Sequence, residues 1–363
     1  MNTNVVRKTD RPTADFTGHT IYLGLDVHRR KWSVTVYVGG TFYKTYQQDS
    51  VGEHLLNFVS RNFPGGRYVA CYEAGFCGFS VYRELRSLGI DCLVVNPNDV
   101  PQTGKGMLSK TDSSDSKRLG FALSRGMLKS IYIPGITIES DRKLLRYRQR
   151  IRRMLSGHRK SLKSTLMVLG IKIPQQHDRT YWSNGFTQWV RSLAITEPSM
   201  QSTLELILDD VEFLRQRLLL TNRKIRKLSA QDRYSKMFGI LTSVPGIGLI
   251  TAMTMLTEIG DIERFGSFAK FNSFIGVCPS EFSSGDKERK GKMTSRKHAR
   301  LRELIIEAAW VAIRADPALT LRFEELTRTK TRKRAIVVIA RKLLSRLYSI
   351  WLKEQLYEKG LIK

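Results

Sequence analysis

The sequence predicts an α/β domain followed by an all-α region, and three observations support this fold class. In the first third of the chain, short apolar runs with period two alternate with segments of helical periodicity, which is typical of a mixed sheet flanked by helices. Beyond residue 136, apolar residues recur every three or four positions, which indicates long helices. Hydrophobic residues make up 41% of the 363 residues, enough to form buried cores, so a wholly disordered chain is excluded.

Composition and periodicity divide the chain into four parts. Residues 1–18 are polar and aperiodic and are expected to form a flexible tail. Residues 19–135 are expected to form the α/β domain, and residues 136–233 a basic helical and coiled-coil linker. Residues 234–363 are expected to form a mostly helical C-terminal domain.

The α/β domain is expected to begin with three strands, over 20–26, 32–38 and 41–46. Gly39 and Gly40 turn the second strand back into the third, so the three strands form an antiparallel meander. The elements expected next are a helix over 51–62, a strand ending at Glu73, a helix over 78–88, a strand over 92–95 and a helix starting near Lys110. This alternation predicts parallel pairing for the later strands, and so a mixed sheet.

The linker is expected to contain two long helices. Between Arg142 and Lys163 the chain carries ten Lys or Arg and no acidic residue, so this amphipathic helix has a cationic outer face. Its candidate nucleic-acid contacts are Arg146, Arg148, Arg150, Arg152, Arg153, Arg159 and Lys160. From Leu204 to Leu228, apolar residues step alternately by three and four, as in the a/d seam of a coiled coil. The seam predicts pairing within the chain or between chains, or burial of the helix on its own domain.

The charge balance indicates a polyanionic partner. Lys+Arg 61 against Asp+Glu 33 gives a formal net charge of +28, which favours nucleic acid or an anionic membrane surface. The membrane surface is disfavoured, because the basic helix lacks an exposed aromatic face. No apolar run reaches the roughly 18 residues of a membrane span, and the N-terminus has no signal-peptide core, so a cytoplasmic protein is expected. The four cysteines form no C-x-x-C pair, which argues against a disulfide scaffold or a zinc site.

Four acidic residues are the candidate catalytic groups of the α/β domain. Asp26 ends the first strand and Glu73 ends the strand expected beside it, so both carboxylates should emerge at one sheet edge. Asp112 and Asp115 lie three residues apart, on one face of a helix start. Each alone fits a structural role as a turn residue or N-cap. Gathered together, they require a compensating cation, and a pair of Mg²⁺ ions, or Mn²⁺ in its place, is the usual device for phosphodiester chemistry.

The C-terminal domain opens with a glycine-containing turn, Val244-Pro-Gly-Ile-Gly248. It looks like a helix-hairpin-helix turn, in which Gly246 and Gly248 let backbone N–H groups approach a phosphate. The alternative is a tight turn between packed helices. The sequence alone leaves both interpretations open.

Ser283 and Ser284 precede Gly285 in a strongly basic region. Residues 286–302 carry eight Lys or Arg against two acids, and positive charge stabilises a serine alkoxide and a pentacovalent phosphate. A serine in a glycine-containing loop is otherwise a turn residue. The basic residues taken here as candidate nucleic-acid contacts are Lys287, Arg289, Lys290, Lys292, Arg296, Lys297 and Arg300.

In their order and spacing these motifs resemble one known family. Gly-Leu-Asp26, Tyr-Glu73-Ala-Gly and Lys-Thr-Asp112-x-x-Asp115, followed by Pro-Gly-Ile-Gly248 and a Ser-Gly loop, are similar to the DEDD insertion-sequence transposases. That family includes the Piv/MooV DNA invertases and the bridge-RNA-guided serine recombinases. The resemblance covers nearly the whole chain, and it implies a RuvC-like, ribonuclease-H fold for the N-terminal domain.

The resemblance also implies roles and partners. Ser284, directly before the glycine, would be the nucleophile, with Ser283 as its competitor, and the four acids would hold Mg²⁺. Two departures from the family pattern, at Ser295 and Lys297, replace its usual lysine and glycine, and Gly75 stands one position early. The implied partners are target and donor DNA, a structured guide RNA and further copies of the chain, as a homodimer assembling into a tetramer. The implied location is a bacterial or archaeal cytoplasm, at the nucleoid.

Two other functions remain open on sequence grounds. A RuvC-like, structure-selective nuclease or junction resolvase would use the four acids alone, and Ser284→Ala would leave its cleavage intact. A non-catalytic nucleic-acid-binding protein would keep its affinity without any Mg²⁺-dependent strand transfer.

Overall fold

The computed structural model describes residues 14–101, 112–177, 182–284, 287–294 and 297–360. The side chains of residue 112 and of residues 279–292 lie outside that description. The chain divides into two compact units, Met1–Ile133 and Pro134–Lys363.

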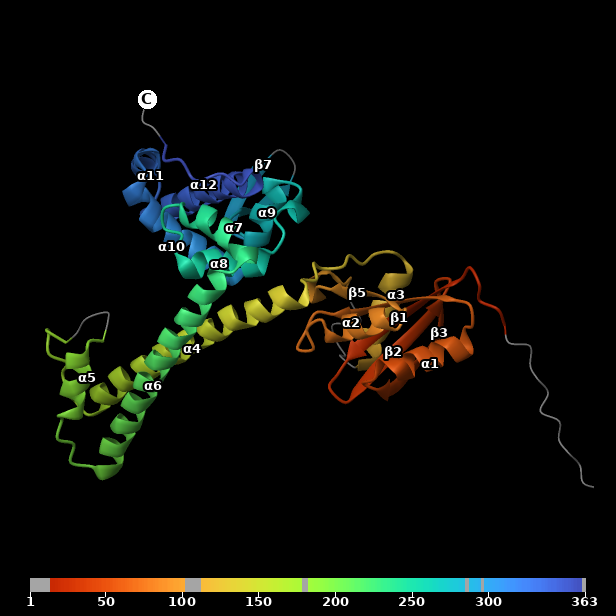
Figure 1. Ribbon diagram of the computed structural model, residues 1–363, viewed down its shortest axis with the longest axis horizontal. Coiled ribbons are helices and arrows are strands. Elements are labelled where there is room, and N and C mark those ends of the chain that lie inside the picture. The colour runs from red at the N-terminus through yellow and green to blue at the C-terminus, as the bar shows by residue number, and fades with distance from the viewer. Residues whose placement is uncertain (1–13, 102–111, 178–181, 285–286, 295–296, 361–363) are drawn as a thin grey trace, which may run out of the picture. The chain divides into compact units, whose positions relative to one another are not determined.

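The first unit contains a mixed five-stranded sheet (Figure 1). Its strands are β1 (Thr20–Val27), β2 (Lys31–Val38), β3 (Thr41–Asp49), β4 (Arg67–Glu73) and β5 (Asp91–Val95). They lie in the order β3-β2-β1-β4-β5. The first three strands pair antiparallel, whereas β4 pairs parallel to both β1 and β5. The predicted antiparallel meander and mixed sheet are confirmed.

Helices cover both faces of this sheet. They are α1 (Gly52–Asn62), α2 (Ser80–Ser87) and α3 (Asp112–Ser124), with a 3₁₀ turn, η1, at Pro97–Asp99. On one face, α1 and α2 bury Leu55 and Leu85 against β1 side chains such as Leu23. On the other face, Leu119 of α3 packs with Cys71 of β4. The three layers give the α/β arrangement that the sequence predicts.

The backbone of α3 lies so close to that of β1 that a side chain would not fit between them. A Cβ on Gly24 of β1 would lie 2.2 Å from both the Gly120 nitrogen and the Ser116 carbonyl oxygen of α3. Beneath the same turn, the Ser116 hydroxyl lies 3.1 Å from that of Ser33 and 2.9 Å from that of Thr35. Glycine and hydroxyl packing therefore fixes the start of α3 against the end of β1.

Two long helices form an antiparallel pair in the second unit. α4 (Ile136–Val168) carries the cationic segment, and α6 (Pro198–Ser229) carries the a/d seam. Leu204 and Leu214 of the seam are buried with Ile151 and Leu162 of α4. The seam is thus used for pairing within the chain. The short helix α5 (Asn184–Arg191) packs on the same cluster at the far end of the pair (Figure 1).

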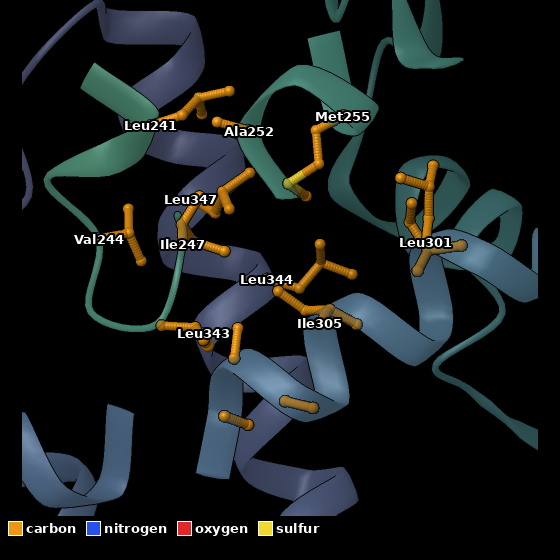
Figure 2. Packing of buried hydrophobic residues seen from close by; sticks show 14 of the residues in the cluster. Leu241, Val244, Ile247, Ala252, Met255, Leu301, Ile305, Leu343, Leu344 and Leu347 are labelled. Atoms are coloured by element: carbon orange, nitrogen blue, oxygen red, sulfur yellow. The ribbon is translucent and has the colours of Figure 1, made fainter. Parts of the chain in front are cut away.

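The rest of the second unit is a helical core with one small hairpin. Its elements are α7 (Asp232–Thr242), α8 (Leu249–Ile259), η3 (Glu263–Phe265), α9 (Phe268–Ile275), β6 (Pro279–Ser284), β7 (Lys287–Met293), α10 (Ala299–Ala315), α11 (Pro317–Thr329) and α12 (Arg332–Lys353). Figure 2 shows Leu241 and Ile247 of the α7–α8 region packing with Ile305 of α10 and Leu344 of α12. Within the described parts of the chain, no helix has the length and apolar character that crossing a membrane requires.

Candidate functional site

The predicted acids of the first unit lie at the carboxyl ends of two adjacent strands. The parallel register of β1 and β4 pairs Leu25 with Tyr72. Asp26 and Glu73 each follow directly after these paired residues, so they leave neighbouring strands at the same level. Both side chains are partly exposed, at 22% and 30%. The sheet therefore brings these two acids to one edge, although they are far apart in the sequence.

Asp115 of α3 is linked to Glu73 through an arginine. Arg118 Nη2 donates to Glu73 Oε1 at 2.8 Å and lies 3.3 Å from Asp115 Oδ1. On the other side, His28 Nε2 lies 3.1 Å from Asp26 Oδ2. A guanidinium shared by carboxylates from β4 and α3 shows that this edge of the sheet holds positive charge among its acids.

The donor set at this edge fits a hard divalent cation in its chemistry. Asp26, Glu73 and Asp115 supply carboxylate oxygens from three different elements, the ligand type that Mg²⁺ selects. The side chain of Asp112, which begins α3, lies outside the described residues. Among the side chains that are described, no three of His, Cys, Asp or Glu already stand close enough to hold a metal. Metal binding here would require Arg118 to give up its present position between Glu73 and Asp115.

The cationic face of α4 divides into outward and inward residues. Of the predicted contacts, the exposed ones are Arg146, Arg150, Arg152, Arg153 and Lys160. Arg148 Nε donates to Asn222 Oδ1 on α6 at 2.6 Å, and the Arg159 guanidinium lies 5.6 Å from the centre of the Trp182 ring. These inward arginines pack the helical pair, so the uninterrupted stretch of basic residues does not mean an uninterrupted cationic surface.

Arg146, although exposed, is paired in a charge cluster centred on the buried Glu258 of α8. Its Nε and Nη2 donate to the two oxygens of Glu258, each at 2.8 Å. Arg142 Nε lies 3.3 Å from Glu258 Oε2, and His298 Nε2 lies 3.4 Å from the same oxygen. Burial alone would raise the pKa of Glu258, but the hydrogen bonds from His298 and Arg146 and their charges lower it to about 2. The carboxylate therefore ties α4 and the start of α10 to α8.

The two glycines of the α7–α8 turn have different surroundings. Gly246 has φ +87°, and a Cβ there would lie 2.4 Å from the Ala308 carbonyl oxygen of α10. This glycine is required by backbone conformation and close helix packing. Gly248 is the N-cap of α8, and a Cβ there would meet nothing within 4 Å. Of the two, only Gly248 stands in open space at a helix N-terminus.

The serine region forms a β-hairpin, where the sequence predicts a loop. β6 and β7 pair antiparallel, with Ser283 opposite Glu288 and Ser284 opposite Lys287. Ser284 is the last residue of β6, so its backbone stands at the hairpin tip. Both serine side chains lie outside the described residues, as do the side chains of Lys287, Arg289, Lys290 and Lys292 and the whole of Arg296. Lys297 is exposed, and Arg300 Nη1 donates to Glu303 Oε2 at 2.9 Å.

The base of this hairpin is held by a residue that the sequence analysis did not single out. Arg302 Nη1, on α10, donates to the carbonyl oxygen of Gly276 at 2.8 Å and to that of Thr294 at 2.9 Å. One guanidinium therefore binds the chain both before β6 and after β7. Thr294 N–H also donates to the Cys278 carbonyl at 3.1 Å. α10 therefore fixes the position of the hairpin base, independently of the conformation of the tip.

Comparison with known proteins shows which proteins this chain is similar to. Residues 239–324 match the family described as "Transposase IS116/IS110/IS902 family". The matched region contains the α8 turn, Glu258, the serine hairpin and Arg302. The transposase for insertion sequence element IS1533 of Leptospira borgpetersenii is 26% identical over 300 residues, covering 80% of this chain and 84% of the relative.

Two further relatives extend the similarity. The transposase for insertion sequence element IS1111A of Coxiella burnetii is 24% identical over 300 residues, 80% of each chain. The y4qE protein of Sinorhizobium fredii is 26% identical over 306 residues, 83% of this chain and 73% of the relative. Because these alignments span about four fifths of the chain, the similarity extends well beyond residues 239–324.

Proposed function

Because the chain belongs to the IS116/IS110/IS902 family of insertion-sequence transposases, we propose that it cuts and rejoins DNA through a covalent serine–DNA intermediate. The observation that carries this proposal is that Asp26 and Glu73 leave neighbouring strands at the same level of one sheet edge, where Arg118 links Glu73 to Asp115 of α3. The order β3-β2-β1-β4-β5, with three antiparallel strands followed by parallel ones, supports a RuvC-like, ribonuclease-H assignment for the first unit. Within Pro134–Lys363 we propose a helical linker over 136–233 and a transposase domain, with a helix-hairpin-helix turn, over 234–363.

The acidic edge would hold Mg²⁺, or Mn²⁺ in its place, through Asp26, Glu73, Asp112 and Asp115. Such an ion polarises a phosphate and stabilises charge on the departing oxygen. The chain's own contribution is to fix three of these residues on β1, β4 and α3, with β4 paired to β1 and α3 in close backbone contact with β1 at Gly24 and Gly120. Arg118 supplies positive charge to Glu73 and Asp115 in the structure as it stands.

Ser284 is the nucleophile in this proposal. Its Oγ forms a bond to phosphorus while the bond from phosphorus to the oxygen of the leaving strand breaks, and that oxygen takes up the serine proton. In the joining step the hydroxyl of the incoming strand attacks the phosphoserine, and the serine hydroxyl is restored. Arg302 is a positioning residue, because it holds both ends of the hairpin that carries Ser284.

Nucleic acid would be gripped along α4 and at the α8 turn. Arg150, Arg152, Arg153 and Lys160 are exposed and suit phosphates of DNA or of a structured guide RNA. The open backbone at Gly248 suits a further phosphate. Contacts of this kind give affinity without sequence choice, which base pairing to a guide RNA would supply. Action on target and donor DNA places the protein at the nucleoid of a bacterial or archaeal cytoplasm.

Assembly into a dimer, and then a tetramer on paired DNA sites, requires a surface that α4 does not already cover. The a/d seam of α6 is buried against α4. The outer face of α6 exposes Leu206, Phe213 and Leu220 at intervals of seven residues, a coiled-coil spacing. We assign the contact with a second copy to this outer face.

The test is to incubate the protein with its flanking-element RNA, paired DNA sites and Mg²⁺, and to map any DNA adduct by peptide mass spectrometry. We expect a phosphoserine link at Ser284 that Ser284→Ala abolishes and the matched control Ser283→Ala retains. An adduct at Ser283 would overturn the residue assignment. Cleavage that persists in Ser284→Ala without an adduct would identify a metal-dependent nuclease of the junction-resolvase type instead.

A further inference from the structure

Phe76 is the most exposed aromatic side chain among the described residues, at 71%. It lies in the turn between β4 and α2, three residues after Glu73. Single exposed apolar residues are common on protein surfaces, so exposure alone carries no function. The position of Phe76 is what indicates a function, because β4 ends at the acidic edge where Glu73, Asp26 and Asp115 lie.

The turn that presents Phe76 is held in place from below. The buried Tyr72 hydroxyl donates to the Gly78 carbonyl at 2.9 Å and accepts the Tyr82 N–H at 3.3 Å. Gly78 N–H donates to Gly75 O at 3.2 Å and closes the turn. Gly78 has φ +60°, which glycine adopts without strain. The phenyl ring is therefore displayed on a fixed backbone, anchored by the residue that precedes Glu73.

We propose that Phe76 stacks on a base of the DNA strand at the cleavage position and holds it apart from its neighbour. This inference rests on the proposed function and names how its acidic site engages DNA. A phosphate at the acidic edge carries its sugar and base with it, and the exposed ring three residues after Glu73 offers that base a stacking partner. Strand exchange requires unpaired bases at the crossover, and inserted apolar side chains supply that separation in nucleic-acid complexes.

The experiment places 2-aminopurine beside the scissile phosphate of the DNA sites and measures its fluorescence when full-length protein and element RNA bind. Wild type should raise the fluorescence, because the base leaves its stack. Phe76→Ala should abolish the rise and slow strand transfer about ten- to a hundredfold, the range of one lost stacking contact. Phe76→Tyr keeps the ring and should stay within about threefold of wild type.

Phe121→Ala is the matched control, since Phe121 is a phenylalanine of the same unit that is 47% exposed on α3. It should leave the fluorescence rise unchanged. Wild-type fluorescence and rate in Phe76→Ala would overturn the inference, and so would absence of a rise in wild type. A fall in the melting temperature of Phe76→Ala would also overturn it, by showing that the ring packs on protein.

The two proposals fail separately. A serine adduct that forms equally fast in wild type and Phe76→Ala refutes the stacking role and leaves the proposed function intact. A fluorescence rise that depends on Phe76, in a protein that forms no serine adduct, supports the stacking role and refutes the serine chemistry.

Discussion

The acidic edge of the first unit and the serine hairpin of the second are held in place by different means. At the acidic edge, backbone meets backbone at Gly24 and Gly120, with buried hydroxyls beneath. Among the described side chains, Arg302 binds the base of the serine hairpin, next to the backbone bond from Thr294 N–H to the Cys278 carbonyl. The proposed metal-binding residues thus belong to a rigid sheet, whereas Ser284, the proposed nucleophile, stands at the tip of a two-stranded hairpin. Substitutions near the acids are therefore expected to change activity by shifting rigidly placed backbone. Substitutions near the serine are expected to change it by altering the order of the hairpin.

The largest effect is expected from Asp26→Asn. Replacing one carboxylate removes a charge from the metal-binding set while keeping the side-chain shape. Mg²⁺-dependent strand transfer should fall about a hundred- to a thousandfold, the loss seen when one electrostatic group leaves an active site. The measurement is the rate of adduct formation at saturating DNA. DNA affinity and melting temperature should stay near wild type, and activity within tenfold of wild type would remove Asp26 from the site.

Glu258→Gln tests the cluster that joins α4, α8 and α10. A folded-state pKa of about 2 against an ordinary 4.5 stabilises the native state by about 3 kcal/mol. Because the pKa is lowered on folding, this stabilisation is present above pH 4.5 and is lost as the pH falls toward 2. Chemical denaturation of wild type and variant should therefore differ by about 3 kcal/mol at pH 7 and converge in acid.

The matched control for that experiment is Glu303→Gln, whose carboxylate is 52% exposed and pairs with Arg300. An exposed pair contributes less than about 1 kcal/mol, so this variant should be near neutral at every pH. Equal pH profiles for the two variants would contradict the special role of the Glu258 cluster.

Gly24→Ala tests the rigidity of the acidic edge directly. The new methyl would lie 2.2 Å from the Gly120 nitrogen and the Ser116 oxygen, which are backbone atoms that cannot rotate away. The first unit should lose about 1–3 kcal/mol of stability, and strand transfer should fall as α3 is pushed from β1. Gly157→Ala on α4, where the methyl meets nothing within 4 Å, should instead be neutral or stabilising by about 1 kcal/mol.

Arg302→Ala should have the smallest effect on global stability and a clear local one. Two carbonyls lose their donor, at a cost of about 1–2 kcal/mol. Amide hydrogen exchange at Thr294 and in β6 and β7 should accelerate about tenfold, while that of α12 stays unchanged. The control Arg314→Ala removes one Nε–H donation to the Trp310 carbonyl and should leave the hairpin amides unaffected. Uniform acceleration across the unit would show that Arg302 supports the whole core.

The sequence allowed the first unit to be predicted well, because its strands and helices follow clear periodicities. The edge shared by Asp26 and Glu73 followed from strand order alone. Arg118 was missed, since its partner Glu73 lies 45 residues away and only the acids of α3 were considered. The sequence did hold one sign of this contact, because Arg118 lies three residues after Asp115 on the same helix.

The second unit was predicted less fully, for two physical reasons. The a/d spacing of α6 shows that this helix packs against a partner helix but does not identify the partner. In the structure the partner is α4. β7 escaped detection because Lys287–Met293 is almost wholly charged, without the apolar alternation by which strands are detected. The common sheet edge of Asp26 and Glu73 followed from the sequence, and the anchoring by Arg302 did not.

The antiparallel α4–α6 pair has a consequence for the length of nucleic acid that the protein spans. At 1.5 Å per residue, the 33 residues of α4 extend about 50 Å, the length of about 15 base pairs of duplex. In a duplex bound along α4, as proposed, contacts at the α5 end and at the α8 end of this pair would lie about one and a half duplex turns apart. Because the seam repeats every seven residues, a heptad removed from both helices would preserve their packing and shorten that spacing by about 10 Å. In the proposed binding mode, the length of the pair would therefore set the spacing between two contact points on the duplex.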